Sequence, residues 1–190
     1  MSFKSFLQDK LGSHNPDEVE ILNLDSLLSN QRYISEEIKE TLEEYFDLKH
    51  LNLNHIGLAC LKNLPFLPSL KSFEVRENLL CGDDLQLILT AFPSIRKLKI
   101  GQNHIKKLDF FDCFAKSNLT ILEVYDNPLT DDIKYKEILF YKIKSLEIID
   151  TIDRDGYNVD TYISDYDDEF SDNSYRDSLK RRNKIIELEL

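Results

Sequence analysis

Hydrophobic residues recur through the middle of the chain in the pattern L-x-x-L-x-L-x-x-N-x-L, with other aliphatic or aromatic residues often in place of leucine. One copy comprises Leu70, Phe73, Val75, Asn78 and Leu80. Another comprises Ile95, Leu98, Ile100, Asn103 and Ile105. A third comprises Leu119, Leu122, Val124, Asn127 and Leu129. A looser copy begins at Leu48, and the copies starting at Leu48, Leu70, Ile95, Leu119 and Ile143 follow one another after 22, 25, 24 and 24 residues.

This pattern predicts a solenoid with one short strand per coil. Alternate side chains of an extended segment point to opposite faces, so the leucines of L-x-L turn inward and the residues between them outward. The asparagine that follows carries two donors and one acceptor, which can satisfy backbone groups where the chain turns. Repeats of about 20 to 29 residues with this pattern are typical of leucine-rich repeats. We therefore predict an α/β, right-handed, curved leucine-rich-repeat solenoid with a parallel sheet on its concave face.

The two ends of the solenoid are predicted from the residues beside the repeats. Phe3, Phe6, Leu7 and Leu11 lie on one face of a short helix, which we expect to cap the open first coil. The segment 135–150 is still hydrophobic but leaves the repeat pattern, as in C-terminal caps of leucine-rich repeats. Beyond it the chain is acidic and poor in aliphatic residues. We expect a capped repeat domain at 1–152 and a tail at 153–190.

Charge is concentrated in the predicted tail. The whole chain carries a formal net charge of −11, of which −7 lies in residues 153–172, whereas residues 173–190 carry +2. Such a balance favours cationic partners and little direct binding of nucleic acid. The longest apolar run is too short to span a membrane. Three cysteines without metal-like pairing favour a reducing, intracellular compartment.

The residues between the leucines are candidates for partner binding on the concave face. They are Asn52, Asn54, Glu74, Arg76, Lys99, Glu123 and Tyr125. Arg76 and Tyr125 are the strongest candidates, because arginine and tyrosine are enriched in binding hot spots. Contact with solvent alone would also require polar residues here, so a recognition surface and a merely hydrated sheet both remain open.

The tail holds a second candidate segment in which aromatic residues stand among acids. It comprises Asp165, Tyr166, Asp167, Asp168, Glu169 and Phe170. One interpretation is a solvated linker; the other is that the acids attract a basic protein against which Tyr166 and Phe170 become buried. The basic run 180–184 fits either a nuclear-import signal or the polar face of a short terminal helix.

Catalytic chemistry finds little support in this sequence. The four histidines are scattered over several coils, and only five glycines are present. Neither a zinc-protease, a serine-hydrolase nor a phosphate-binding loop motif occurs. We expect a chain that is not an enzyme, with no cofactor, no metal and a monomeric state.

Four stretches make the chain resemble the acidic leucine-rich nuclear phosphoproteins. They are HNPDEVEILNLDSLLSN (14–30), NHIGLACLKNLPFLPSLKSFEVREN (54–78), CGDDLQLILTAFPSIRKLKIGQNHIKKL (81–108) and YKEILFYKIKSLEIIDTIDRDG (135–156). The resemblance implies a non-catalytic protein that binds basic proteins such as histones, modulates a phosphatase, and is nuclear with shuttling to the cytoplasm. It also implies the roles of histone chaperone and phosphoprotein. The family's tail is much longer than the one found here.

A second resemblance gives an alternative from another functional class. The loop NPLTDDIKY (127–135) is similar to that of the A-prime protein of the spliceosomal branch-site particle. This likeness implies a leucine-rich-repeat scaffold that holds an RNA-binding protein within a ribonucleoprotein.

Overall fold

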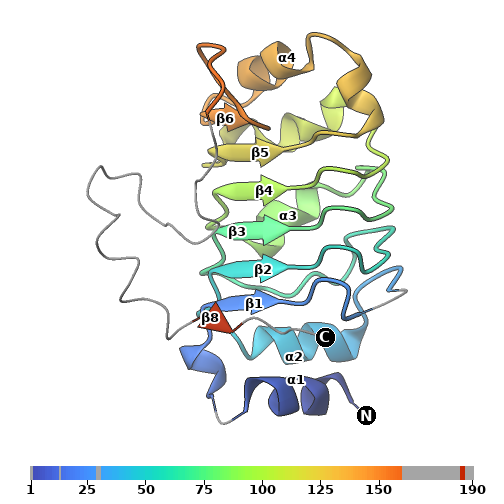
Figure 1. Ribbon diagram of the computed structural model, residues 1–190, viewed down its shortest axis with the longest axis vertical. Helices are drawn as coiled ribbons and strands as arrows, with labels where there is room; N and C mark the ends of the chain where they lie inside the picture. The colour runs from blue at the N-terminus through green and yellow to red at the C-terminus, as the bar shows by residue number, and fades with distance from the viewer. Residues whose placement is uncertain (1, 13, 29–30, 160–184, 187–190) are drawn as a thin grey trace, which may run out of the picture.

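The computed structural model describes residues 2–12, 14–28, 31–159 and 185–186. The chain winds in successive coils, with short strands stacked along one side and helices or turns along the other (Figure 1). The predicted leucine-rich-repeat solenoid is confirmed. Among the described residues, no helix combines the length and the apolar character needed to cross a bilayer.

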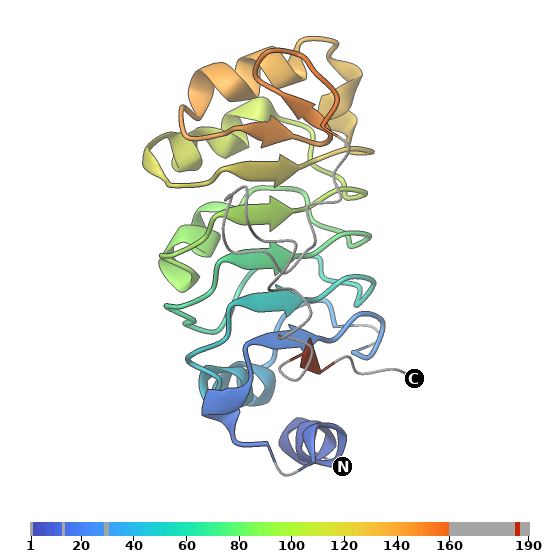
Figure 2. The ribbon, with the colours of Figure 1, turned by 60° about the vertical axis from the view of Figure 1, so that its left-hand side comes forward.

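A single sheet contains all the described strands. Its members are β1 (Ile21–Asn23), β2 (His50–Asn52), β3 (Ser72–Glu74), β4 (Lys97–Lys99), β5 (Ile121–Glu123), β6 (Ile148–Ile149), β7 (Ile152–Asp153) and β8 (Ile185–Ile186). Their spatial order is β7-β6-β5-β4-β3-β2-β1-β8. All neighbours pair in parallel except β6 and β7, which are antiparallel. Figure 2 shows the same stack from a second direction.

Alternation within each three-residue strand explains the two faces of the sheet. The middle residues turn into the core and are fully buried: Leu22, Leu51, Phe73, Leu98 and Leu122. The first and third residues of each strand point the other way, toward the concave face. The return segments include η1 (Pro16–Glu18), α2 (Glu36–Glu43), α3 (Gln86–Ala91), η2 (Leu108–Lys116), η3 (Pro128–Asp131) and α4 (Tyr135–Lys142).

The asparagines of the repeat pattern satisfy backbone groups at the turns, as predicted, and together they form a ladder that joins neighbouring coils. The amide nitrogen of Asn78 donates to the carbonyl of Leu53, and its oxygen accepts from the N–H groups of Gly57 and Leu58. Asn103 and Asn127 bond in the same manner to the coils before them. All three side chains are buried. Each therefore satisfies backbone groups that the turn removes from water.

Helix α1 (Phe3–Leu11) covers the first coil, as predicted. Phe3, Leu7 and Leu11 are buried, and Phe6 is half-buried against the same core. The helix is tied to α2 by a hydrogen bond from the N–H of Phe3 to Glu37 (2.7 Å). Its apolar face thus replaces the neighbouring coil that the first repeat lacks.

The other end is closed by α4, β6 and β7, and hydrogen bonding continues past residue 152. Arg154 donates to the carbonyls of Leu146 (2.5 Å) and Lys144 (2.8 Å) and lies 5.0 Å from the centre of the Phe140 ring. The N–H of Val159 donates to the carbonyl of Thr151. The cap therefore includes residues beyond the expected boundary, because an arginine counted with the acidic tail joins it to the last coil.

The described residues of the C-terminal end form a strand. Ile185 and Ile186 pair in parallel with Ile21 and Leu22 of β1, at the far end of the sheet from β7 (Figure 1). A strand at these two residues differs from the terminal helix that one interpretation of the basic end expected.

Candidate functional site

Three parallel rows of side chains form the concave face. The row at the start of the strands contains Ile21, His50, Ser72, Lys97 and Ile121. The middle row contains Asn23, Asn52, Glu74, Lys99 and Glu123. Two residues further along each coil, the last row contains Asp25, Asn54, Arg76, Gly101 and Tyr125. The register of the coils brings all seven concave-face candidates onto this one surface.

Four of the candidates form an ion-pair network at the centre of the face. Arg76 places its Nη2 2.8 Å from Oε2 of Glu123 and donates from Nη1 to Glu74 over 2.9 Å. Lys99 lies 3.2 Å from Glu74 and 3.9 Å from Glu123. These four side chains are 7% to 22% exposed. Two acids and two bases balance in this network, so it exerts little net attraction on a charged partner.

The environment of Arg76 keeps its charge in place. Burial acts to lower the pKa of the guanidinium, but Glu123 and Glu74 outweigh this effect and raise the pKa above its usual value. A partner that drew both carboxylates away from Arg76 would leave a largely buried charge uncompensated. Arg76 is therefore positioned by its own sheet and is not a free cation waiting for an acidic ligand.

Tyr125 lies against the network through a gap left by Gly101. A Cβ at Gly101 would lie 2.8 Å from Cε1 of the Tyr125 ring, closer than such atoms approach. Burial is the main cause that raises the pKa of the Tyr125 phenol, while Arg76 acts to lower it. The ring can approach this coil so closely because position 101 has no side chain.

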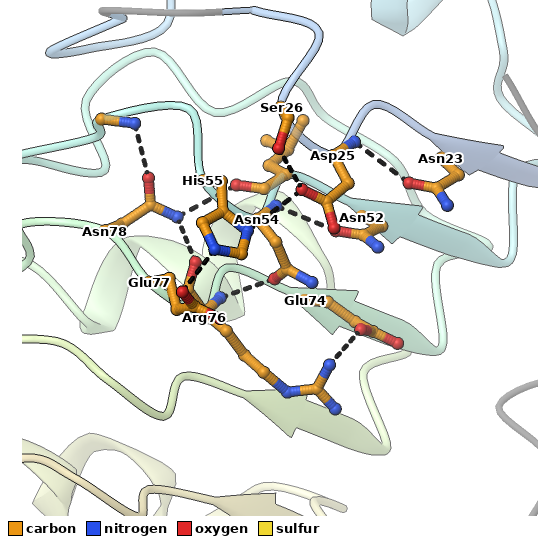
Figure 3. Close-up of polar contacts among 12 residues, drawn as sticks. Asn23, Asp25, Ser26, Asn52, Asn54, His55, Glu74, Arg76, Glu77 and Asn78 are labelled. Carbon is orange, nitrogen blue, oxygen red and sulfur yellow. Dashed lines mark hydrogen bonds and ion pairs between the residues drawn. The ribbon is translucent and has the colours of Figure 1, made fainter. Parts of the chain in front are cut away.

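The first coils form a different, hollowed part of the face. A cavity of about 220 Å³ is lined by Asn23, Asp25, His50, Asn52, Asn54, Ser72, Glu74 and Arg76, among others. Figure 3 shows the asparagines lying beside one another, with Glu74 and Arg76 at one side. Asn52 and Asn54 thus line this cavity instead of joining the charged network.

His55 stands at the rim of this region between two carboxylates. Its Nδ1 lies 3.1 Å from Oδ1 of Asp25, and its Nε2 contacts Glu77 (Figure 3). His55 and Glu77 have left-handed backbone angles (φ 54° and 53°), as do the residues at the matching positions of other coils. The repeated geometry directs one polar side chain per coil along the rim.

Sequence reasoning located the rows but missed two features. It did not assign a role to Gly101, although this position breaks a row that is otherwise polar. It also treated His55 only as one of four scattered histidines. The positions of Gly101 and His55 within their repeats put both residues on or beside the concave face, so the repeat spacing alone could have identified them.

Other candidate chemistry has little support in the described residues. Within them, no group of three or more histidine, cysteine or acidic side chains has the arrangement of a metal site. Burial raises the pKa of the Cys113 thiol to about 11, which makes it a poor nucleophile. The tail candidates at 165–170 lie outside the described residues.

Comparison with known proteins supports the assignment from geometry. A family described as "Leucine-rich repeat" matches residues 23–154. An acidic leucine-rich nuclear phosphoprotein 32-related protein of Plasmodium falciparum is 34% identical over 128 residues, covering 66% of this chain and 46% of the relative. Family member A of Drosophila melanogaster is 30% identical over 138 residues, covering 72% and 50%.

A third relative carries a different name. A protein of Tetrahymena thermophila that is named as a histone is 27% identical over 151 residues, covering 79% of this chain and 38% of the relative. The chain spans half or less of the length of each of these three relatives.

Among solved structures, the Drosophila melanogaster SNF/U2A' complex contains a chain with the same fold. The TM-score is 0.59 at 21% sequence identity, over 70% of this chain and 74% of that one. The register, the asparagine ladder and the family match agree with one another. The chain belongs to the leucine-rich-repeat family, and its relatives include the acidic leucine-rich nuclear phosphoproteins.

Proposed function

We propose that this chain is a non-catalytic interaction module that binds basic proteins, histones foremost, in the nucleus. The observation that carries the proposal is the placement of charge: the ion pairs of the concave face balance, while −7 of the net −11 lies in residues 153–172. Long-range attraction to a cation would then come from the tail, and shape recognition from the concave face.

The names of the relatives support the nuclear part of this proposal, whereas the histone part comes from the family resemblance and the charge of the tail. Two of them are named acidic leucine-rich nuclear phosphoproteins, and a third is named a histone. Shuttling to the cytoplasm, binding of a phosphatase and phosphorylation are further parts of the proposal that come from the family resemblance. We also propose that the chain beyond the cap, which ends later than the expected boundary at 152, acts as a tail distinct from the capped repeats.

Titration with purified core-histone dimers tests the proposal. Tyr166→Ala with Phe170→Ala should weaken binding about tenfold or more if these rings are anchors. Tyr141→Ala is the matched control, because Tyr141 is 75% exposed on α4 and lies outside the tail. Raising the salt should weaken binding, since charges separated by more than about 8 Å are screened at physiological ionic strength. Absence of histone binding by the unaltered chain would refute the proposal.

A ribonucleoprotein scaffold is the second candidate function. It is favoured by the likeness in fold to a chain of the SNF/U2A' complex. A pull-down from nuclear extract separates the two candidates. Recovery of histones supports the first function, whereas recovery of an RNA-recognition protein with small nuclear RNA supports the second.

A further inference from the structure

Three asparagines of the first coils use only one end of their side chain in the described structure. The oxygen of Asn23 accepts from the N–H of Asp25 (3.0 Å), and that of Asn52 from the N–H of Asn54 (2.9 Å). The oxygen of Asn54 accepts from the N–H of Arg76 (2.7 Å). Among the contacts between described residues, none is donated by these three amide nitrogens, and Figure 3 shows them without a dashed line.

The ladder asparagines make the opposite use of the same side chain. Asn78, Asn103 and Asn127 each donate from nitrogen and accept at oxygen. Residue type therefore does not account for the unused donors of the first coils. Their position within the repeat accounts for the unused donors, because these three asparagines project onto the concave face and not into the turn.

A buried hydroxyl at the same place adds an independent observation. Ser72 is 1% exposed, and its Oγ has no hydrogen-bond partner among the described residues. Most buried polar groups in folded proteins are paired, because a buried group without a partner destabilises the fold. Ser72 lines the same cavity as Asn23, Asn52 and Asn54. Four side chains thus offer donors to one space of about 220 Å³.

The charges around this cavity select the kind of acceptor. Glu74 and Arg76 pair with each other, and Asp25 contributes a further carboxylate. Such a lining does not attract phosphates or other anions. Neutral acceptors remain, and the carbonyls of a polypeptide backbone are the most abundant of these in proteins. Within the described part of the chain, Asp25 and, at the rim, Glu77 share only His55 between them, and these two carboxylates also suit a partner with basic side chains.

Spacing favours an extended segment over a helix. Asn52 and Asn54 are two residues apart, the interval at which carbonyls on one side of an extended chain recur. In a helix the carbonyls point along the axis and are already bonded, except in the last turn.

We propose that this cavity binds an extended, basic segment of a protein partner through its main-chain carbonyls. Asn23, Asn52, Asn54 and Ser72 are the donors. The inference deepens the proposed function and rests on it, because it names what the concave face would recognise in a basic protein.

Substitution of asparagine by aspartate tests the inference sharply. Asn52→Asp keeps the oxygen that holds the turn, removes both amide donors and adds a negative charge. Simple charge attraction would strengthen the binding of a basic ligand, whereas loss of carbonyl recognition should weaken it about fivefold to tenfold. The same result is expected for Asn23→Asp. Asn118→Asp is the matched control, because Asn118 is exposed and lies outside the cavity.

The probes are a dodecapeptide of alternating lysine and glycine, and spermine, which is cationic but has no carbonyl. The full chain is titrated with each by calorimetry, and the side-chain amide signals of Asn23, Asn52 and Asn54 are followed by NMR. We expect these signals to shift with the peptide and not with spermine. No peptide binding by the unaltered chain, or equal or stronger binding by Asn52→Asp, would overturn the inference.

Parallel titration with core-histone dimers separates this inference from the proposed function. Histone binding that is insensitive to Asn52→Asp would refute a role of the cavity in binding, but it would leave the proposed histone-binding function standing. Peptide binding that depends on Asn52, without any histone binding, would support the cavity as a binding site and refute the proposed histone-binding function.

Discussion

The phenol of Tyr135 donates a 2.6 Å hydrogen bond to Oδ2 of Asp150. The other oxygen of Asp150 accepts from the N–H groups of Val124 (2.8 Å) and Tyr125 (3.0 Å). One carboxylate therefore ties helix α4 and strand β6 to the last regular coil. It also fixes the backbone of Tyr125, so the cap and the candidate binding face share one contact.

Tyr135→Phe should destabilise the fold by about 1 to 3 kcal/mol, because it leaves Oδ2 of Asp150 without its donor. Urea unfolding followed by circular dichroism measures this change. Tyr141→Phe serves as the control, since Tyr141 is 75% exposed and no hydrogen bond joins its hydroxyl to another described residue. Equal midpoints for the two variants would contradict the importance of the bond.

Alkaline pH should weaken the fold through the same tyrosine. Burial, followed by the bond to Asp150, raises the pKa of Tyr135 above its ordinary value of about 10. The folded protein thus holds this proton more tightly than the unfolded chain. Its contribution to stability is complete below about pH 10 and is lost as the pH rises toward the folded-state pKa. Unfolding midpoints measured from about pH 8 to 12 should fall less steeply in Tyr135→Phe.

The repeat pattern predicted the coils and the ladder because those features depend on residues at fixed intervals within one coil. Asn78 and Asn103 are examples, since each position is fixed by its distance from the strand before it. The cap extended further than expected, because Arg154 stabilises it through carbonyls eight to fourteen residues earlier. Its neighbours in sequence are acids, and composition alone grouped it with them.

The candidate site was predictable only as a set of positions. Spacing placed Arg76 and Glu123 on one face, but their pairing across 47 residues depends on the twist and register of the whole stack. Because of this pairing, Arg76 is a cation whose charge is balanced by carboxylates of its own sheet, and not a cation available to a partner. A side-chain donor without a partner, such as the amide nitrogen of Asn52, cannot be predicted from the sequence, because it is recognised only when the other hydrogen bonds of the structure are known.

Asn103→Ala should cost about 2 to 5 kcal/mol, because its removal leaves several buried backbone groups without partners. Its amide nitrogen donates to the carbonyls of Val75, Ile100 and Gly101, and its oxygen accepts from the N–H of Leu80. Asn118→Ala is the matched control, because Asn118 is exposed. Thermal and urea unfolding should both separate the two variants, and a loss below about 1 kcal/mol for Asn103→Ala would contradict the ladder's role.

Gly101→Ala should displace the ring of Tyr125 with little effect on stability. The new methyl group would occupy the space in which Cε1 of that ring now lies. NMR chemical shifts of the Tyr125 ring report the displacement directly. If Tyr125 contributes to binding through this position, Gly101→Ala and Tyr125→Ala should weaken histone binding without adding to each other in a double-mutant cycle. Additive losses would indicate that the two residues act separately.

Arg154→Ala should destabilise the C-terminal cap by about 1 to 2 kcal/mol, because the exposed Arg154 donates to the carbonyls of Phe140, Ile143, Lys144 and Leu146. The ammonium group of lysine cannot donate to these carbonyls as the planar guanidinium does, so Arg154→Lys should recover less than half of the stability lost in Arg154→Ala. Chains ending at 152 and at 159 provide the companion test, since both lack β8. If the cap extends through Arg154, only the shorter chain should unfold at lower urea concentration. Equal stability of the two chains would place the end of the fold at residue 152.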